Sequence, residues 1–247
     1  MSDRFKKLNS FVYEEVYTHK VRPPDIANWL SVHFGQCGED LIVVALLSAY
    51  ASKRNLKMAD LTYCEIGGNH PIATSATYLL YTQYGMKGVI VEANPALIAD
   101  LEKVRIHDQI VHAAITTNDE KLVLLTVSND SELSSLDHEF VANWPGDGGG
   151  VKEQIFVPAT RITSLLNEYF SEDLPAYLSI DVEGLDLSII QDLDLNKYRP
   201  YIIQMEPSDH HLANNSDKMI SYMNENRYSL IAKTNVNLIF VDSGGIC

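Results

Sequence analysis

The chain has 247 residues, of which 46% are hydrophobic, and 33 acidic against 19 basic residues give it a formal net charge of −14. This length and composition suffice for one large domain with a buried core. A chain this acidic, without a basic stripe, repels phosphate backbones and anionic lipid surfaces. We therefore expect no nucleic-acid partner and no membrane insertion.

Targeting and cysteine patterns favour a reducing compartment. The first residues, MSDRFKKLNSF, lack the apolar stretch of a secretory signal, and the longest apolar run, residues 41–51, is too short to span a bilayer. Three cysteines, Cys37, Cys64 and Cys247, are odd in number and have no metal-ligand spacing. We expect free thiols and a cytoplasmic location, and homo-oligomer formation stays open.

The first sixty residues have the periodicity of helices. Apolar residues recur at helical spacing over 5–17 and 26–34. A third, mostly apolar helix is expected over 39–53, because it starts with two acids and ends with a base, as the helix dipole favours. Residues 1–60 are therefore predicted to form a helical extension that packs on a core domain of residues 61–247.

From residue 61 onward, short apolar strands alternate with helical segments. The expected strands are 61–66, 88–93, 109–115, 176–181 and 200–206. The expected helices are 71–84, 95–104, 185–192 and 215–226. This alternation is typical of βαβ units, and the continuous apolar runs of the first strands indicate an α/β fold with helices on both faces of a parallel sheet.

Further strands are expected at two places. Segments 121–128 and 154–162 flank a glycine-rich loop, and a loop of that length is usually a lid or a binding loop. Within its 137–152 part, Trp144 either stacks on a ligand ring or anchors its own loop. Strands 228–234 and 235–242 follow each other almost directly, which allows only an antiparallel hairpin. We expect a mostly parallel sheet that ends in this hairpin.

Glycines and polar residues stand where the first strands end, which is where open α/β sheets bind ligands. After the first strand come Glu65, Gly67, Gly68 and Asn69, and glycines there allow a ligand to approach the backbone. Pro71 suits the first position of the following helix. The turn is therefore a candidate cofactor site.

The second and third strands add a nucleoside site. Glu92 ends the second strand, where a carboxylate can accept both hydroxyls of a ribose. Asn94 has the character of a helix N-cap, which explains it without a ligand. In the third strand, His112 is followed by Ala113 and Ala114, whose small side chains leave room for an adenine but also suit core packing.

Three acids are expected at the same edge of the sheet. Asp181 ends the fourth strand and Glu206 ends the fifth. Glu183 lies two residues after Asp181 and faces the same side if the fourth strand continues that far. Such acids repel one another unless a cation, a proton or a cationic substrate lies among them. Ion pairing with Arg161 or Arg199 is the structural alternative.

Five segments, in this order, resemble the FkbM family of S-adenosylmethionine-dependent methyltransferases. They are QCGED (36–40), IGGN (66–69), VEANP (91–95), IDVEG (180–184) and RPYIIQME (199–206). The resemblance covers most of the chain, and it implies a Rossmann-like class I methyltransferase fold with a seven-stranded sheet and extra N-terminal helices. Two departures are Glu65, where aspartate is usual, and Gly68, where alanine is usual.

The resemblance also implies roles for individual residues. The glycine turn would lie against the methionine part of S-adenosylmethionine, with Glu65 toward its amino group, Glu92 on the ribose and residues 112–114 along the adenine. Glu39 and Asp40 would approach the mouth of the site or serve the helix dipole. The expected cofactor-binding set is Gln36, Glu65, Gly67, Gly68, Asn69, Glu92, Asn94, His112, Ala113 and Asp181.

The acceptor implied by the resemblance is a hydroxyl of a sugar, a glycan or a natural-product small molecule. Transfer needs a base for the hydroxyl proton, and Asp181 is preferred, with His210 and His138 as alternatives. The expected catalytic set is Asp181, Glu183, Glu206 and His210. A divalent Mg²⁺, Ca²⁺ or Mn²⁺ held by Asp181, Glu206 and Asp209 or His210 is a further alternative.

A nucleotide-binding protein without methyl transfer is the rival interpretation. A nicotinamide-dependent reductase should lack the closing antiparallel hairpin and should carry a proton relay, of which the sequence has no sign. A non-catalytic binding module could keep Glu92 and the glycines, but it would have no use for the acids at 181, 183 and 206.

Overall fold

The computed structural model describes residues 33–146, 149–171 and 173–244. The helices predicted over 5–17 and 26–34 lie almost wholly outside the described residues. Within this part of the chain, no helix combines the length and the apolar character needed to cross a bilayer.

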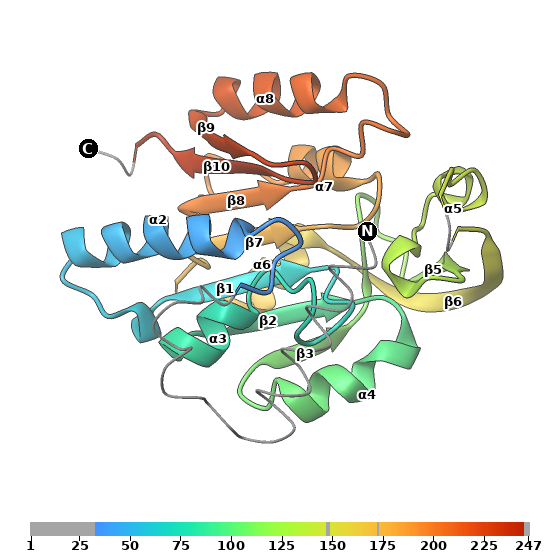
Figure 1. Ribbon diagram of the computed structural model, residues 1–247, viewed down its shortest axis with the longest axis horizontal. Coiled ribbons are helices and arrows are strands. Elements are labelled where there is room, and N and C mark those ends of the chain that lie inside the picture. The colour runs from blue at the N-terminus through green and yellow to red at the C-terminus, as the bar shows by residue number, and fades with distance from the viewer. Residues whose placement is uncertain (1–32, 147–148, 172, 245–247) are drawn as a thin grey trace, which may run out of the picture.

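A seven-stranded sheet forms the centre of the molecule, in the order β3-β2-β1-β7-β8-β10-β9 (Figure 1). The strands from β3 to β8 run parallel, whereas β10 is antiparallel to both of its neighbours. The predicted mostly parallel sheet with a C-terminal antiparallel hairpin is confirmed. Its strands are β1 (Thr62–Ile66), β2 (Lys87–Glu92), β3 (Gln109–His112), β7 (Tyr177–Ile180), β8 (Ile202–Met205), β9 (Tyr228–Lys233) and β10 (Leu238–Asp242).

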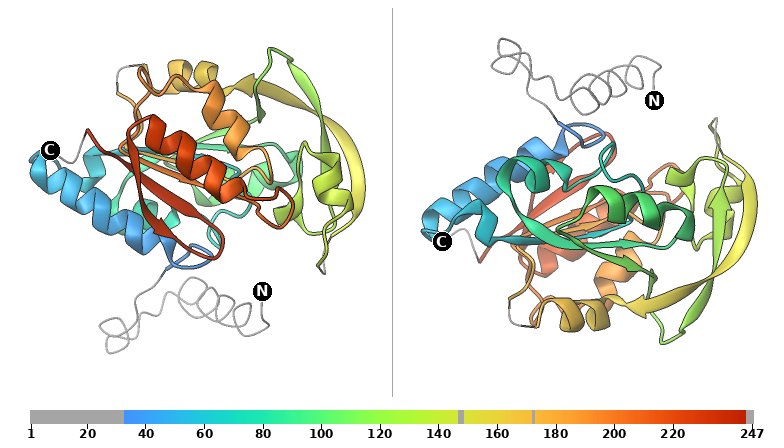
Figure 2. Two further views of the ribbon diagram at one scale, coloured as in Figure 1. Left: turned by 90° about the horizontal axis from the view of Figure 1, so that it is seen from above. Right: turned by 90° about the horizontal axis from the view of Figure 1, so that it is seen from below.

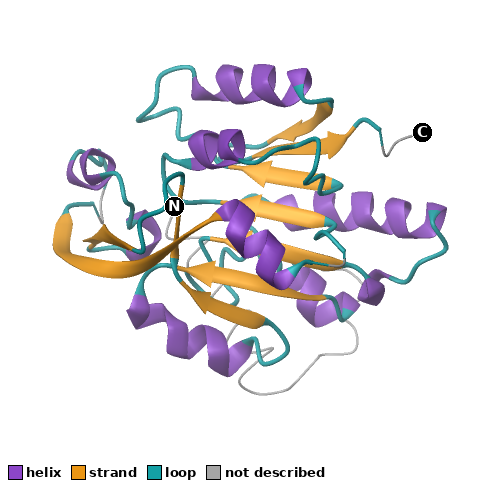
Figure 3. Cartoon of the chain, turned by 180° about the vertical axis from the view of Figure 1, so that it is seen from behind, coloured by secondary structure: helices purple, strands orange, loops and turns teal. Residues whose placement is uncertain are grey.

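Helices cover both faces of this sheet, which makes three layers (Figures 2 and 3). A short 3-10 helix, η2 (Met58–Asp60), precedes β1. On one face lie α2 (Glu39–Lys53), α3 (Tyr78–Tyr84) and α4 (Pro95–Val104). On the other lie α6 (Ile162–Tyr169), α7 (Asp186–Asp192) and α8 (Asn215–Glu225).

Alternation along the strands fills the two cores. In β1, Tyr63 packs with Leu47 of α2 on one face, while Ile66 packs with Leu165 of α6 on the other. Successive side chains of a strand point to opposite faces, so a strand with helices on both sides is apolar throughout. That is the reason for the continuous apolar runs in the sequence.

A second, three-stranded sheet lies beside the carboxyl ends of the central strands (Figure 1). It contains β4 (Ala114–Thr116), β5 (Leu122–Ser128) and β6 (Val151–Arg161), with β6 in the middle. Between β5 and β6 the chain forms η3 (Ser131–Leu133) and α5 (His138–Ala142). The single strand predicted over 109–115 is wrong, because the chain leaves the main sheet at Ala113 and continues as β4 in the small one.

Two helix predictions also differ from the structure. The helix predicted over 71–84 begins only at Tyr78, so Pro71 is not its first residue. The preceding segment is irregular because its backbone and hydroxyl groups bind the buried Glu65 carboxylate. The sequence prediction lacks helix α6, although Ile162, Leu165 and Leu166 have its apolar spacing, because the predicted strand 154–162 covers its first residue.

Candidate active site

A cavity opens at the carboxyl ends of β1, β2 and β7, between the main sheet and the small one. A smaller cavity adjoins it, and Gln36, Gly67, Thr74 and Asp181 line both. Of the predicted site residues, the first cavity is lined by Gln36, Gly67, Gly68, Asn69, Glu92, Ala113, Asp181 and Glu183. Glu65 lines the second cavity, whereas Asn94, His112, Glu206, Asp209 and His210 line neither.

The glycine turn is required by close backbone contacts. A Cβ atom on Gly67, where φ is +91°, would lie 1.8 Å from the carbonyl oxygen of Asp181. A Cβ on Gly68 would lie 2.4 Å from Cγ2 of Ile90. Both glycine N–H groups donate to the carbonyl of Val91, at 2.9 and 3.0 Å. Any side chain here would push the floor of the cavity away from β2 and β7.

Glu92 is buried, and its partners are backbone amides. Its Oε2 accepts the N–H of Asn69 at 2.7 Å, and its Oε1 accepts the N–H of Asn94 at 2.6 Å. Burial raises the pKa of this carboxyl, and the amide hydrogen bonds oppose that shift. Each carboxylate oxygen can accept more than one hydrogen bond, so both retain capacity for a ligand in the cavity.

Asn94 and His112, the other two residues predicted to bind the nucleoside part of the cofactor near Glu92, do not line the cavity. Asn94 caps α4, because its Oδ1 accepts the N–H of Ala96 at 3.1 Å, and Pro95 is the first helical residue, as predicted. The ring of His112 lies 3.2 Å from the carbonyl of Ala93. The predicted contacts of Asn94 and His112 with a cofactor stay predictions.

Glu65 holds the loop that follows the glycine turn. Its carboxylate accepts the N–H of Ala76 at 2.9 Å, the hydroxyl of Ser75 at 3.1 Å and the hydroxyl of Thr77. Burial raises the pKa of Glu65, while the charge of Arg105 and these hydrogen bonds oppose the shift. The carboxylate therefore has a structural role in addition to lining the smaller cavity.

Arg105 is a positioning residue that sequence reasoning missed. Its side chain is fully buried, and its Nη1 lies 4.0 Å from Glu65 Oε2. It pairs with Asp108 at 2.8 Å and donates to the hydroxyls of Thr77 at 2.7 Å and Tyr63 at 3.0 Å. The only signal in the sequence is an arginine three residues before an aspartate, at the end of a helix.

Replacing Arg105 with methionine should lower the free energy of unfolding by roughly 3–5 kcal/mol, because it leaves the Glu65 and Asp108 carboxylates buried without a cation. Urea unfolding would measure the loss. Lys103→Met, on the exposed face of α4, is the matched control and should change stability by less than about 0.5 kcal/mol. Equal stabilities of the two variants would contradict this role.

The QCGED segment joins the start of α2 to the C-terminal hairpin. Glu39 accepts the hydroxyl of Thr234 at 2.8 Å and the N–H of Cys37 at 2.8 Å. Asp40 accepts the N–H of Phe34 at 2.6 Å. Both carboxylates are buried, and only Glu39 lines a cavity, so Asp40 does not reach the mouth of the site.

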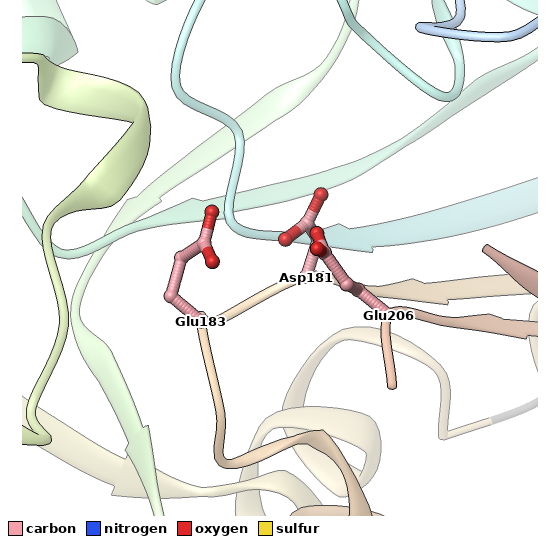
Figure 4. A group of neighbouring side chains, drawn as sticks. All are labelled: Asp181, Glu183 and Glu206. Carbon is pink, nitrogen blue, oxygen red and sulfur yellow. The ribbon is translucent and has the colours of Figure 1, made fainter. Parts of the chain in front are cut away.

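Three acids converge as the sequence predicts. Carboxylate oxygens of Asp181, Glu183 and Glu206 all lie within 4.8 Å of one another (Figure 4). Parallel pairing of β7 with β8 brings Asp181 and Glu206 to the same edge. Strand alternation does not explain Glu183, because β7 ends at Ile180 and Glu183 has a φ of +57°. A turn, rather than a strand, returns its carboxylate to the cluster.

The arginine pairing considered for these acids is wrong. Arg161 pairs with Asp192, and Arg199 pairs with Asp242. Among the described residues, no lysine or arginine lines either cavity. The cluster therefore keeps its negative character toward a ligand.

Burial and mutual repulsion raise the pKa values of the acids. Burial raises the pKa of Asp181 to about 6, although a hydrogen bond from Glu206 opposes the shift. Burial, followed by the charges of Asp181 and Glu183, raises the pKa of Glu206 to about 11. Near neutral pH Glu206 therefore keeps its proton and donates a hydrogen bond to Asp181, which is ionised.

These shifts predict a pH-dependent stability. Above about pH 4 the unfolded carboxyls lose protons that the folded state keeps. The free energy of unfolding should therefore fall as pH rises through about 6, the folded pKa of Asp181. Glu206→Gln, which removes one shared carboxyl, should reduce this fall by roughly 1–3 kcal/mol in urea unfolding with EDTA present. If the free energy of unfolding depends on pH in the same way in Glu206→Gln and in the unchanged protein, the raised pKa values of these two acids are refuted.

The other predicted catalytic residues lie apart from the cluster. Asp209 accepts the N–H of Ser216 at 2.8 Å and its hydroxyl, and it does not belong to the group of converging acids. His138 Nδ1 lies 3.3 Å from the amide nitrogen of Gln154. The exposed His210 packs its ring against Trp144, with centroids 4.6 Å apart.

The loop between β5 and β6 is anchored by its own aromatic residue. Trp144 contacts Phe140 of α5, with centroids 5.4 Å apart, and a Cβ on Gly149 would lie 2.8 Å from its ring. This is the anchoring role considered for Trp144. The segment that faces the cavity is 131–136, where Ser131 donates to Asn69 Oδ1 at 3.0 Å.

The order of the strands defines the class of protein. Counted within the main sheet alone, the order is 3-2-1-4-5-7-6, with the seventh strand antiparallel between the fifth and the sixth. A nicotinamide-binding Rossmann sheet has the order 3-2-1-4-5-6 instead. The chain therefore has a Rossmann-like methyltransferase fold, and the reductase alternative is not supported.

The family follows from the sequence. Residues 65–230, about two thirds of the chain, match the family model described as the methyltransferase FkbM domain. The chain belongs to this family of methyltransferases, and four of its five resembling segments lie within the match, whereas residues 36–40 precede it.

Similar solved structures are distant in sequence. The O-methyltransferase from Bacillus cereus in complex with SAH is 11% identical, over 95% of this chain and 97% of that chain, with a TM-score of 0.44. The N-terminal domain of human METTL16 in complex with SAH is 11% identical, over 93% and 78% of the two chains, with a TM-score of 0.44. Scores this low carry no argument about the chemistry. No curated protein sequence matches the chain.

Proposed function

We propose that the protein is an S-adenosylmethionine-dependent O-methyltransferase acting on a hydroxyl of a sugar, a glycan or a natural-product small molecule. One observation carries the proposal. Glu92, the glycine turn and the acids after β7 line a single cavity at the carboxyl edge of the sheet. This arrangement supports the proposal, because a carboxylate for the ribose and a base for proton transfer would share one site.

The cavity suits the adenosine part of the methyl donor. Both Glu92 oxygens retain acceptor capacity for the ribose hydroxyls, and Ala113 and Ala114 present small side chains for the adenine. S-adenosylmethionine supplies a methyl group activated by a positively charged sulfur. The acidic walls, which lack lysine and arginine among the described residues, complement that charge.

The smaller cavity suits the methionine ammonium group. Glu39 and Glu65 line it together with Asn237, a residue that is 5% exposed. The Oδ1 atom of Asn237 has no hydrogen-bond partner within the described chain. A buried acceptor of this kind is costly unless a donor reaches it. An ammonium group between these acceptors would satisfy it.

Asp181 is the proposed base. It lines both cavities, so it faces the junction between the nucleoside and methionine parts of the donor site. A pKa of about 6 leaves its carboxylate ionised at neutral pH and close in basicity to the operating pH. The protein's other contribution is to hold the acceptor oxygen in line with the transferred methyl group.

The charge of the site also limits the acceptor. Walls that carry carboxylates and, among the described residues, no basic side chain would repel phosphorylated or carboxylated molecules. The same repulsion argues against nucleic acid as the acceptor. Neutral hydroxyl compounds of small-molecule or glycan type remain the proposed class.

Isothermal titration calorimetry tests the donor, and methyl transfer tests the reaction. We expect S-adenosylmethionine and its demethylated product SAH to bind, and NADH to produce no heat. Radiolabelled methyl groups should enter the small-molecule or glycan fraction of a cell extract. Binding of NADH alone would refute the proposal, and SAH binding without any transfer would favour the non-catalytic module.

A further inference from the structure

We infer that Asp181, Glu183 and Glu206 form a binding site for one hard divalent cation, beside the methyl-donor cavity. The site differs from the set expected from the sequence, because Glu183 replaces Asp209. The inference rests on the proposed function only for the role of the ion, and not for its binding.

The spacing of the oxygens fits a cation. One carboxylate oxygen from each residue lies within 4.8 Å of the others (Figure 4). Calcium–oxygen bonds of about 2.3–2.6 Å and magnesium–oxygen bonds of about 2.0–2.1 Å both place neighbouring ligands of one ion within this distance. The three oxygens can therefore ligate a single divalent ion.

Glu183 provides an independent observation. Its Oε2 atom is shielded from solvent and has no hydrogen-bond partner among the described residues. Its backbone is held in the left-handed region at φ +57°, and its carbonyl accepts the hydroxyl of Ser135 at 2.8 Å. A shielded carboxylate oxygen without a partner, on a side chain that a left-handed turn brings to two other acids, is explained by a ligand such as a cation.

Asp186 supports the two segments that carry the acids. Its Oδ1 accepts the N–H of Glu206 at 3.0 Å, and its Oδ2 accepts the N–H of Val182 at 3.3 Å. It therefore fixes the turn after β7 relative to the end of β8. Groups behind the ligands of a metal site commonly act in this way.

The donor set favours a metal ion over an organic ammonium group. All three groups are carboxylates, which are the preferred ligands of hard divalent cations. With all three groups ionised, a single positive charge would leave two negative charges uncompensated in a buried site, whereas a divalent ion leaves one. In the proposed reaction the ion would orient the acceptor hydroxyl and favour loss of its proton.

Cation binding can be measured without the reaction. The full chain is stripped with EDTA and titrated with Mn²⁺, and the free ion is followed by electron paramagnetic resonance. We expect one Mn²⁺ per chain, competed by Ca²⁺. Glu183→Gln and Glu206→Gln should each weaken binding at least about 10-fold. Asp209→Asn is the matched control and should bind Mn²⁺ like the unchanged protein, because Asp209 lies outside the cluster.

A thermal shift assay keeps the test valid if a variant is less stable. Saturating Mn²⁺ should raise the Tm of the unchanged protein by a few degrees and should leave that of folded Glu183→Gln unchanged. Absence of binding at about 100-fold molar excess of Mn²⁺ and of Ca²⁺, or equal affinity of all variants, would overturn the inference. The inference would also be overturned if the protein bound ethanolamine, an organic ammonium compound, instead of the metals and if this binding depended on Glu183 and Glu206. An SAH titration of the same sample shows separately whether the proposed function stands.

Discussion

Asp181→Asn should lower kcat for methyl transfer roughly 10²–10⁴-fold and leave SAH affinity within about threefold, because general-base catalysis typically contributes a factor of this size. Asparagine has the same shape as aspartate and can still accept the hydrogen bond from Glu206. The backbone N–H of residue 181 still donates to the carbonyl of Ile66, at 2.9 Å. The substitution therefore removes the base and keeps the site.

The pH profile identifies the base more specifically than the rate alone. Burial raises the pKa of Asp181 to about 6 in the metal-free protein, so kcat of the unchanged enzyme, measured with EDTA present, should rise with pH through this value as the carboxylate forms. The residual activity of Asp181→Asn should lack this limb. Asp217→Asn, an exposed acid of α8, is the charge-matched control. Full activity of Asp181→Asn would show that another group takes the proton.

Glu92→Ala should weaken binding of SAH at least about 100-fold, because each hydrogen bond to a charged group contributes roughly 1.5–3 kcal/mol and a ribose offers two hydroxyls. The variant also leaves the N–H groups of Asn69 and Asn94 without their acceptor. Calorimetric titration with SAH measures the loss directly and needs no acceptor. Glu92→Gln keeps the size of the side chain and one acceptor oxygen, so its affinity for SAH should lie between that of Glu92→Ala and that of the unchanged protein.

Two controls separate binding from folding in this experiment. Glu102→Ala removes an exposed acid from α4 and should leave SAH affinity unchanged. The Tm of Glu92→Ala shows how far the turn around Asn69 is disturbed. If folded Glu92→Ala binds SAH within about threefold of the unchanged protein, less than 1 kcal/mol, then Glu92 does not hold the ribose.

Some features could be predicted from local sequence because local chemistry decides them. Strands with helices on both faces must be apolar throughout, and a hairpin with almost no connection must be antiparallel. Gly67 stands directly after β1 and Glu92 is the last residue of β2, so their position at the edge of the sheet follows from the strands themselves. Asn94 and Pro95 start a helix through their own side chains.

Other features depend on partners far along the chain. The helix predicted from residue 71 yields to an irregular loop because the buried Glu65 carboxylate needs the N–H and hydroxyl groups of residues 75–77. Glu65 in turn faces Arg105, forty residues later in the chain. No periodicity in the sequence reports such a contact, because a single polar residue on a helix end has many alternative partners.

The candidate site divides in the same way. Acids follow β7 and β8 in the sequence, and parallel strands must bring such ends to one edge. Which acids meet depends on the fold around them: a left-handed turn brings Glu183 in, and Ser216 holds Asp209 outside. Glu39 likewise binds Thr234 across 195 residues of chain. Strand-end chemistry is local, whereas the choice of partner depends on how turns and packing orient each side chain.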